Sequence, residues 1–229
     1  MSRATPRLDQ KITNPMKTFK VSCLLPSAAL ALALVGAVSA TTITSGGHLV
    51  TNEGMMTTQA GATTTTFDGL TLLPTGFTAS GTTPSNPLVS HSSNGVYAAP
   101  ANDTSTFLTT GSGSITDHLA AGTTYLGFYW GSIDNYNTLS LTESNGTVLS
   151  YTGATVASAA GLDADGNHSY FVNFFANPGV TFTSATFGAS RNSFEFDNVA
   201  SATPEPGTVA MLAGGLLIVA GTFRRRRKA

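Results

Sequence analysis

The clearest pattern along the chain is a series of short stretches in which hydrophobic and polar residues alternate or aromatic residues cluster. Residues 138–143 (TLSLTE) alternate with a period of two, and residues 125–130 (YLGFYW) are rich in aromatic side chains. Similar stretches follow at residues 147–152, 169–175, 180–187 and 193–199. Short strands separated by turns predict an all-β domain, an antiparallel β-sandwich or jelly roll.

One hairpin can be predicted together with its register. A three-residue loop at residues 144–146 (SNG), with its glycine in the left-handed conformation, would place Leu141 opposite Leu149. The same loop would place Leu139 opposite Tyr151, so that the apolar residues share one face. A two-residue loop would shift the pairing by one residue and turn that face to water, so we expect the three-residue loop.

A longer apolar run lies near the start of the chain. Residues 24–38 follow Lys17 and Lys20 and lead to small residues ending at Ala40. This order is typical of a secretory signal peptide, with cleavage expected after Ala40. A retained membrane helix is the alternative reading, but the run is shorter than the roughly 20 residues that a bilayer requires.

A second apolar run lies near the end of the chain. Residues 206–223 would be about 27 Å long as a helix, just enough for a bilayer core, and a basic cluster follows them. Such a segment is typical of a single membrane anchor whose basic end stays in the cytoplasm. The chain therefore divides into an N-terminal extension with signal peptide (1–40), an extracellular β-domain (41–203) and a C-terminal tail (204–229).

The tail resembles a known sorting signal. A Pro-Glu-Pro tripeptide, a short apolar span containing glycine and a terminal arginine cluster resemble the PEP-CTERM signal of bacterial surface proteins; the residues concerned are Pro204, Glu205, Pro206, Arg224, Arg225, Arg226 and Arg227. The resemblance implies export, followed by processing near the tripeptide by an exosortase-type membrane enzyme. Such tails are also catalogued as ice-binding protein C-terminal domains, a label that says nothing about ice.

The middle of the chain carries a second resemblance. The segments LGFYWGSIDNYNT (126–138), YFVNF (170–174) and FEFDN (194–198) resemble a recurring all-β extracellular domain found upstream of PEP-CTERM tails. It covers roughly residues 67–200. The resemblance implies surface placement and fold rather than a ligand or catalytic residues.

The charges are strongly segregated along the chain. The whole sequence has 11 Lys and Arg against 12 Asp and Glu, yet residues 41–203 contain only Arg191 as a base. Because ten of the acids lie in that same segment, its formal charge is −9. A domain with one base cannot neutralise a run of phosphates, which argues against nucleic-acid binding.

One candidate for carbohydrate binding surrounds the single tryptophan. Aromatic faces stack on sugar rings, and neighbouring polar side chains could bond to sugar hydroxyls; the candidate residues are Trp130, Asp134, Asn135 and Tyr136. Alternate residues of a strand point to opposite faces, however, so at least half of the aromatic residues here must be core. Structural packing is therefore the competing interpretation of Trp130.

A candidate calcium site lies in the segment FEFDN. Its two phenylalanines fall on one face of a strand and its two acids on the other, and the acids have almost no basic partner. Calcium prefers oxygen ligands, so Glu195, Asp197 and Asn198 are candidate ligands. The alternative is a solvated strand edge.

The segment DADGN (163–167) departs from the EF-hand spacing and predicts a turn.

These observations favour a non-enzymatic protein. The histidines have no metal-ligand spacing, and no Gly-x-Ser-x-Gly sequence is present. We expect an exported protein with a structural or adhesive role, held at the membrane before processing and then located at the cell surface or outside the cell. The alternative is a module that binds exopolysaccharide, with or without calcium. Ice binding is a weaker alternative, since the threonine run at 63–66 does not recur with any period.

Overall fold

The computed structural model describes residues 41–204 and 214–215, and the fold below is that of this part of the chain. The expected signal peptide, its cleavage site at Ala40 and the expected sorting signal beyond Pro204 lie outside the described residues. No helix within the described ranges is both long and apolar enough to cross a membrane.

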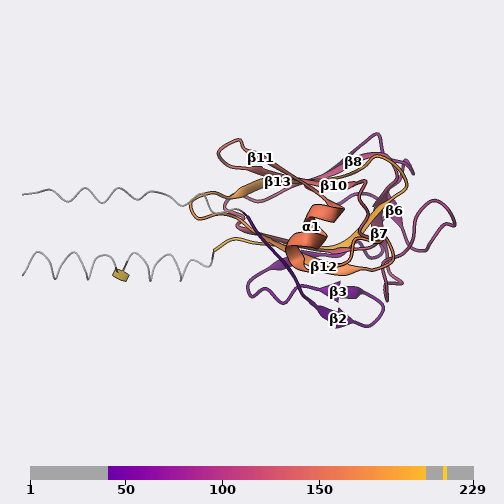
Figure 1. Ribbon diagram of the computed structural model, residues 1–229, viewed down its shortest axis with the longest axis horizontal. Coiled ribbons are helices and arrows are strands. Elements are labelled where there is room, and N and C mark those ends of the chain that lie inside the picture. Colours follow the sequence, from indigo (N-terminus) through magenta and orange to yellow (C-terminus); the bar gives the residue numbers. More distant parts are fainter. Residues whose placement is uncertain (1–40, 205–213, 216–229) are drawn as a thin grey trace, which may run out of the picture. The chain divides into compact units, whose positions relative to one another are not determined.

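Two antiparallel sheets face each other and form a sandwich (Figure 1). The first has the spatial order β1 (Thr42–Ser45), β12 (Tyr170–Phe175), β9 (Tyr125–Trp130), β14 (Phe194–Ala202), β7 (Phe107–Thr110) and β6 (Leu88–Val89), with β4 (Thr63–Thr65) also paired to β14. The second has the order β11 (Val148–Thr152), β10 (Asn137–Glu143), β13 (Phe182–Ala189), β8 (Gly113–His118) and β5 (Phe77–Ser80). The all-β prediction is confirmed, and all six predicted strands are present.

The predicted register of the β10–β11 hairpin is also confirmed. Leu141 lies opposite Leu149, and Leu139 lies opposite Tyr151. Gly146 closes the loop with φ +85°, in the left-handed region expected for it. The alternation of leucines, together with a turn of this length, therefore determines which face of the hairpin is buried.

The core between the sheets consists largely of aromatic rings. Phe196 of β14 stacks on Phe187 of β13, with 4.1 Å between the ring centroids, which joins the two sheets directly. Trp130 of β9 stacks on Phe194 at 4.5 Å, and Phe128 packs edge-on against Phe187. All five side chains are completely buried, so this layer supplies much of the hydrophobic stabilisation.

A small hairpin covers part of the opposite face of the first sheet. It consists of β2 (His48–Val50) and β3 (Gly54–Met56), and Met55 packs against the buried cluster that contains Tyr125, Tyr129 and Phe171. Strand β9 is therefore buried on both faces along all six residues. A strand covered on both sides need not alternate between apolar and polar residues, which explains the continuous aromatic run.

One short helix interrupts the β-structure, and the alternating pattern did not predict it. Helix α1 (Gly153–Ala160) begins directly after β11, where the Thr152 hydroxyl accepts the amide of Thr155 at 3.2 Å. It ends at Gly161 in the left-handed conformation. An N-cap threonine and a C-terminal glycine therefore define a helix of eight residues rich in small side chains.

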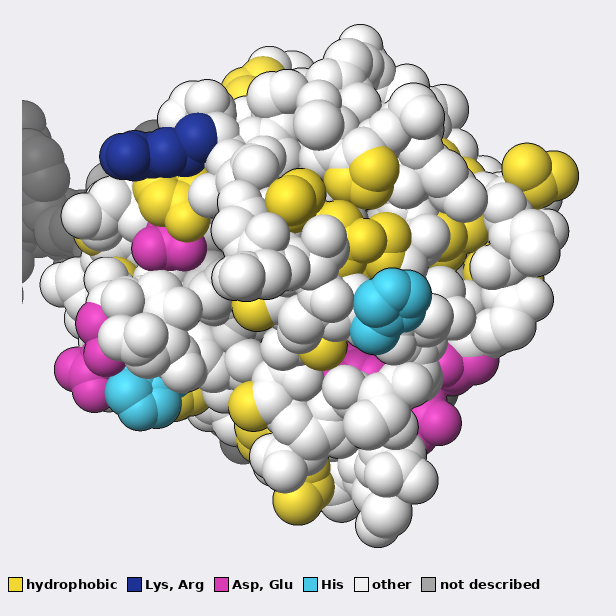
Figure 2. Space-filling view, turned by 90° about the vertical axis from the view of Figure 1, so that its right-hand side faces the viewer, with side chains coloured by type: hydrophobic (Ala, Val, Ile, Leu, Met, Phe, Trp, Pro, Cys, Tyr) yellow, Lys and Arg dark blue, Asp and Glu magenta, His cyan; other side chains and the backbone are white. Residues whose placement is uncertain are grey.

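The surface of the described domain is acidic and almost free of basic groups. Figure 2 shows one face, on which dark blue appears in a single place and magenta in several. Arg191 is the only Lys or Arg among residues 41–204, and its guanidinium lies 4.6 Å from the ring centroid of Tyr136. The one basic side chain is thus engaged with an aromatic face.

Candidate functional site

Strand β14 carries two buried acids on the outer face of the first sheet. Phe194 and Phe196 point into the core, and Glu195 and Asp197 point to the other side, as the alternation predicts. Glu195 is 1% exposed and Asp197 is completely buried. The interpretation of this segment as a solvated strand edge is therefore wrong, because loops that are distant in sequence cover both carboxylates.

Neutral donors surround the Glu195 carboxylate. Its Oε1 accepts the amide of Ala98 at 3.1 Å and the hydroxyl of Ser193, and its Oε2 accepts the hydroxyl of Ser132 at 2.8 Å. Burial raises the pKa of Glu195, and these hydrogen bonds to the ionised form oppose that rise. The carboxylate therefore ties the loop at residues 92–98 and the end of β9 to strand β14.

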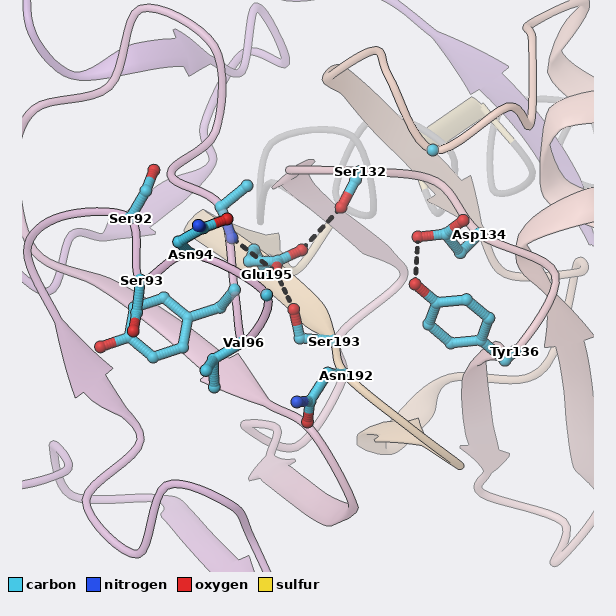
Figure 3. A pocket seen from close by; sticks show the side chains of 14 residues that line it. Ser92, Ser93, Asn94, Val96, Ser132, Asp134, Tyr136, Asn192, Ser193 and Glu195 are labelled. Carbon is cyan, nitrogen blue, oxygen red and sulfur yellow. Dashed lines mark hydrogen bonds between the residues drawn. The ribbon is translucent and has the colours of Figure 1, made fainter.

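An open hollow of about 430 Å³ lies beside Glu195, and we call it the polar hollow. It is lined by a loop at residues 92–98, a loop at residues 132–136, residues 192–195 and Gly166 (Figure 3). Its lining consists mainly of hydroxyl, amide and carboxylate groups, from Ser92, Ser93, Asn94, Ser132, Asp134, Tyr136, Asn192, Ser193 and Glu195.

A tyrosine and an aspartate are paired at one side of the polar hollow. The hydroxyl of Tyr136 donates to Asp134 Oδ2 at 2.6 Å (Figure 3). Burial raises the pKa of Tyr136, and the neighbouring Asp134 carboxylate raises it further. The guanidinium of Arg191 lies over the ring of Tyr136 in a cation–π contact and so covers one of its two faces.

The structure separates the four residues predicted to bind carbohydrate. Trp130 is completely buried between Phe128 and Phe194, so its indole offers no face to a sugar; the prediction of a sugar platform at Trp130 is wrong. Asp134 and Tyr136 lie together in the polar hollow. Asn135 is exposed between them and is not part of the lining.

A second group of acids surrounds Asp197, and we call it the acidic cluster: Glu53, Asp68, Asp103 and Asp197. The hydroxyl oxygen of Ser105 lies 2.6 Å from Asp103 Oδ1 and 3.3 Å from Asp197 Oδ2. Burial, and then the charges of Asp103 and Asp68, raise the pKa of Asp197 to about 9. Burial and the neighbouring Asp68 likewise raise the pKa of Glu53.

A β-bulge places Asn198 beside the acidic cluster. The register between β14 and β9 shifts between Asp197 and Ala200, and Asn198 has φ +51°. Its side-chain amide donates to the carbonyl oxygens of Glu53 at 2.6 Å and Met55 at 3.1 Å. Two consecutive side chains, Asp197 and Asn198, therefore lie on the same side of the strand, which regular alternation forbids.

The predicted calcium ligands are thus divided between two places. Glu195 faces the polar hollow, whereas Asp197 and Asn198 belong with the acidic cluster. Among residues 41–204, no three His, Cys, Asp or Glu side chains already stand in a metal-binding arrangement. In the segment 163–167, Asp165 Oδ1 accepts the amide of Asn167 at 2.9 Å, which is the predicted turn.

Sequence reasoning missed the partners of both buried acids. Asp103 and Glu53 come from loops far from β14 in the sequence, and the loop at residues 92–98 has no periodic pattern. The only sequence signal for them is the shortage of basic residues, which leaves most acids of the domain without an ionic partner.

Comparisons of the chain with protein-family models, with curated proteins and with solved structures found no match.

Proposed function

We propose that this is a non-enzymatic exported protein with a structural or adhesive role in the bacterial envelope or extracellular matrix. The observation that carries the proposal is the division of charge: ten of the 11 basic residues lie outside residues 41–203, in the two segments that resemble export and sorting signals. The acidic sandwich between them supports the same reading. Its self-repulsion suits a protein that must stay soluble outside the cell.

The processing steps follow from the two end segments. Signal peptidase would cleave after Ala40, and an exosortase-type enzyme would act near Pro204, Glu205 and Pro206. The apolar run at residues 206–223 would hold the precursor in the membrane until the second step. The mature protein would then remain at the cell surface or in the extracellular matrix.

Changes in the tail should therefore misplace the protein. We expect Glu205→Ala to leave most of the protein unprocessed in the membrane fraction, because the processing enzyme would lose its recognition sequence. Deletion of residues 224–228 should leave the protein misplaced, because the apolar segment would lose its cytoplasmic stop. Fractionation and mass spectrometry of the mature termini measure this. Arg191→Ala, which removes a base outside the tail, is the matched control. Normal processing of both tail variants would contradict the proposal.

A second candidate function, binding of exopolysaccharide, is favoured by the polar hollow. Its hydroxyl, amide and carboxylate groups match the donors and acceptors of sugar hydroxyls, and Tyr136 adds an aromatic side chain. The hollow has the size of a small-ligand site, about 430 Å³. We therefore propose Asp134 and Tyr136, rather than Trp130, as the centre of the candidate carbohydrate site.

The double variant Asn94→Ala/Tyr136→Ala should weaken retention on the producer's exopolysaccharide about tenfold, since a loss of about 1.4 kcal/mol has that effect. Asn135→Ala is the matched control, because Asn135 is exposed and lies outside the lining. Pull-down with immobilised polysaccharide measures binding, and thermal melting verifies folding. Equal retention of the double variant and the wild type would exclude the polar hollow as the binding site.

A further inference from the structure

The acidic cluster contains buried oxygen atoms that accept no hydrogen bond. They are Glu53 Oε2, Asp103 Oδ2 and Asn198 Oδ1. Asp103 is 4% exposed and Asn198 is completely buried, so neither side chain is freely hydrated. A buried polar atom without a hydrogen-bond partner destabilises the folded state, so three such atoms in one cluster indicate that a ligand for these oxygens is missing.

The described residues supply no cation to this cluster. Arg191 lies over Tyr136, and the one ion pair within residues 41–204 joins His168 to Asp165. The cluster therefore gathers carboxylates from the loop at Glu53, from Asp68, from Asp103 and from Asp197 with no basic side chain among them. Buried neighbouring carboxylates destabilise the folded state unless some of them are protonated or together bind a cation.

Backbone contacts hold the segments of the acidic cluster together. Glu53 and Asp103 form an isolated bridge, and the amide of Thr104 donates to the carbonyl of Asn52 at 2.9 Å. Asn198 reaches across from β14 to the carbonyl of Glu53. These contacts fix the main chain at Glu53, Asp103 and Asn198. The carboxylates can therefore change position only by rotation about their side-chain bonds.

We propose that the acidic cluster binds one calcium ion. The ligands would be carboxylate oxygens of Glu53, Asp103 and Asp197 and the amide oxygen Asn198 Oδ1, with Asp68 adding charge from the exposed side. Calcium takes six to eight oxygen ligands in flexible geometry and accepts mixed carboxylate and carbonyl sets. The donor set contains only oxygen, which suits calcium better than zinc. Binding requires the carboxylates to turn toward one point, replacing the hydroxyl that Asp103 and Asp197 now share.

Glu195 does not belong to this site. Both of its carboxylate oxygens already accept hydrogen bonds, from Ala98, Ser193 and Ser132. In the acidic cluster, by contrast, Glu53 and Asp103 each keep a buried oxygen without a hydrogen-bond donor. The proposed calcium site combines strand β14, with its bulge at Asn198, and the two loops that carry Glu53 and Asp103.

Calcium titration of the full chain after chelation tests the proposal directly. We expect saturable binding of one ion per chain by isothermal titration calorimetry, and a melting temperature that rises with calcium concentration. Magnesium should give a much smaller rise, since it demands a near-ideal octahedral site. Absence of calcium binding by the wild type at millimolar concentration, or an equal rise with magnesium, would overturn it.

Single amide substitutions test which acids are ligands. Asp103→Asn and Asp197→Asn should each weaken calcium binding at least tenfold, and Asp163→Asn, an exposed acid outside the cluster, should leave it unchanged. With chelator present, Asp197→Asn should melt no lower than the wild type, because it removes one of the repelling carboxylates. With calcium present, it should melt lower than the wild type, because it lacks a ligand for the ion. If either buried variant does not fold, Asp68→Asn, which changes an exposed member, should still weaken binding severalfold. Wild-type affinity in the folded variants would refute the assignment. None of these results depends on polysaccharide binding.

Discussion

Trp130→Ala should destabilise the protein by about 3–5 kcal/mol, the range typical of removing a large aromatic side chain from a core. Trp130 is completely buried and stacks on Phe194 at 4.5 Å, with Phe128 at 5.4 Å on the same sheet face. Its removal leaves a cavity between the two sheets that neighbouring rings cannot fill without leaving their rotamers. Because domains are stable by only about 5–15 kcal/mol, such a loss is a large share of the total.

Thermal or urea unfolding measures this effect, with Trp130→Phe as the matched control. Phenylalanine keeps an aromatic ring in the core and removes the indole N–H, which has no hydrogen-bond partner. We therefore expect the control to lose less than half as much stability. An alanine variant that unfolds like the wild type would show that the indole does not pack in the core. This result also determines how polysaccharide binding by Trp130→Ala is to be read: lost binding would reflect unfolding rather than a lost sugar contact.

Gly54→Ala should have a comparable effect, for a different reason. Gly54 begins β3 with φ +69°, a conformation that costs other residues about 1–2 kcal/mol. A Cβ at this position would also lie 2.6 Å from Cδ1 of Tyr129. Tyr129 cannot move aside, because it is 1% exposed and its hydroxyl donates to the carbonyl of Ala101 at 2.6 Å. With about 1–3 kcal/mol for overpacking, the total is roughly 2–5 kcal/mol.

Gly146→Ala separates the two causes. Gly146 has φ +85°, but a Cβ there would meet no atom within 4 Å. We expect this control to lose only about 1–2 kcal/mol, the backbone cost alone. The difference between the two variants in urea unfolding measures the close approach of β3 to Tyr129. If both variants lose the same stability, Gly54 does not pack closely against Tyr129.

The sequence predicted best those parts of the fold that local pattern controls. Leu139 and Leu141 alternate with polar residues, and a glycine closes the turn after them, so both the strand and its register could be derived. The strands between residues 41 and 100 could not be located, because most are only two to four residues long and polar. Strands this short are determined by the sheet they join rather than by their own sequence.

Burial on both faces misled the interpretation of β9 and β14. Alternation correctly assigned Trp130 and Phe128 to one face and Tyr129 to the other, and it placed Glu195 and Asp197 together. It could not show that the second face is also covered, since the loops that cover it are far away in sequence. The acids therefore appeared as a solvated edge, and Trp130 as a candidate platform, before the tertiary contacts were known.

The candidate site depends on contacts of the same long-range kind. Asp134 and Tyr136 are close in sequence and were found, whereas the loop at residues 92–98 that completes the polar hollow was not. Asn198 was singled out, but no pattern indicates that a bulge turns it toward Asp197. The bulge shifts the alternation by one residue, so that Phe194 and Phe196 face the core before it and Val199 faces the core after it.

The order of strands in the first sheet also determines how the domain would bear a mechanical load. One row of paired residues crosses β1, β12, β9 and β14 and consists of Thr42, Phe175, Tyr125 and Ala202. The start of the first strand, β1, and the end of the last strand, β14, therefore lie at the same end of the sheet, about 14 Å apart at the usual strand spacing. Trp130 in the core and Glu195 beside the polar hollow lie toward the opposite end. A pull applied at position 204 would act along β14, which hydrogen-bonds to β9 on one side and to β7 and β4 on the other. Such shear must break several bonds at once, whereas peeling an edge strand breaks them one by one.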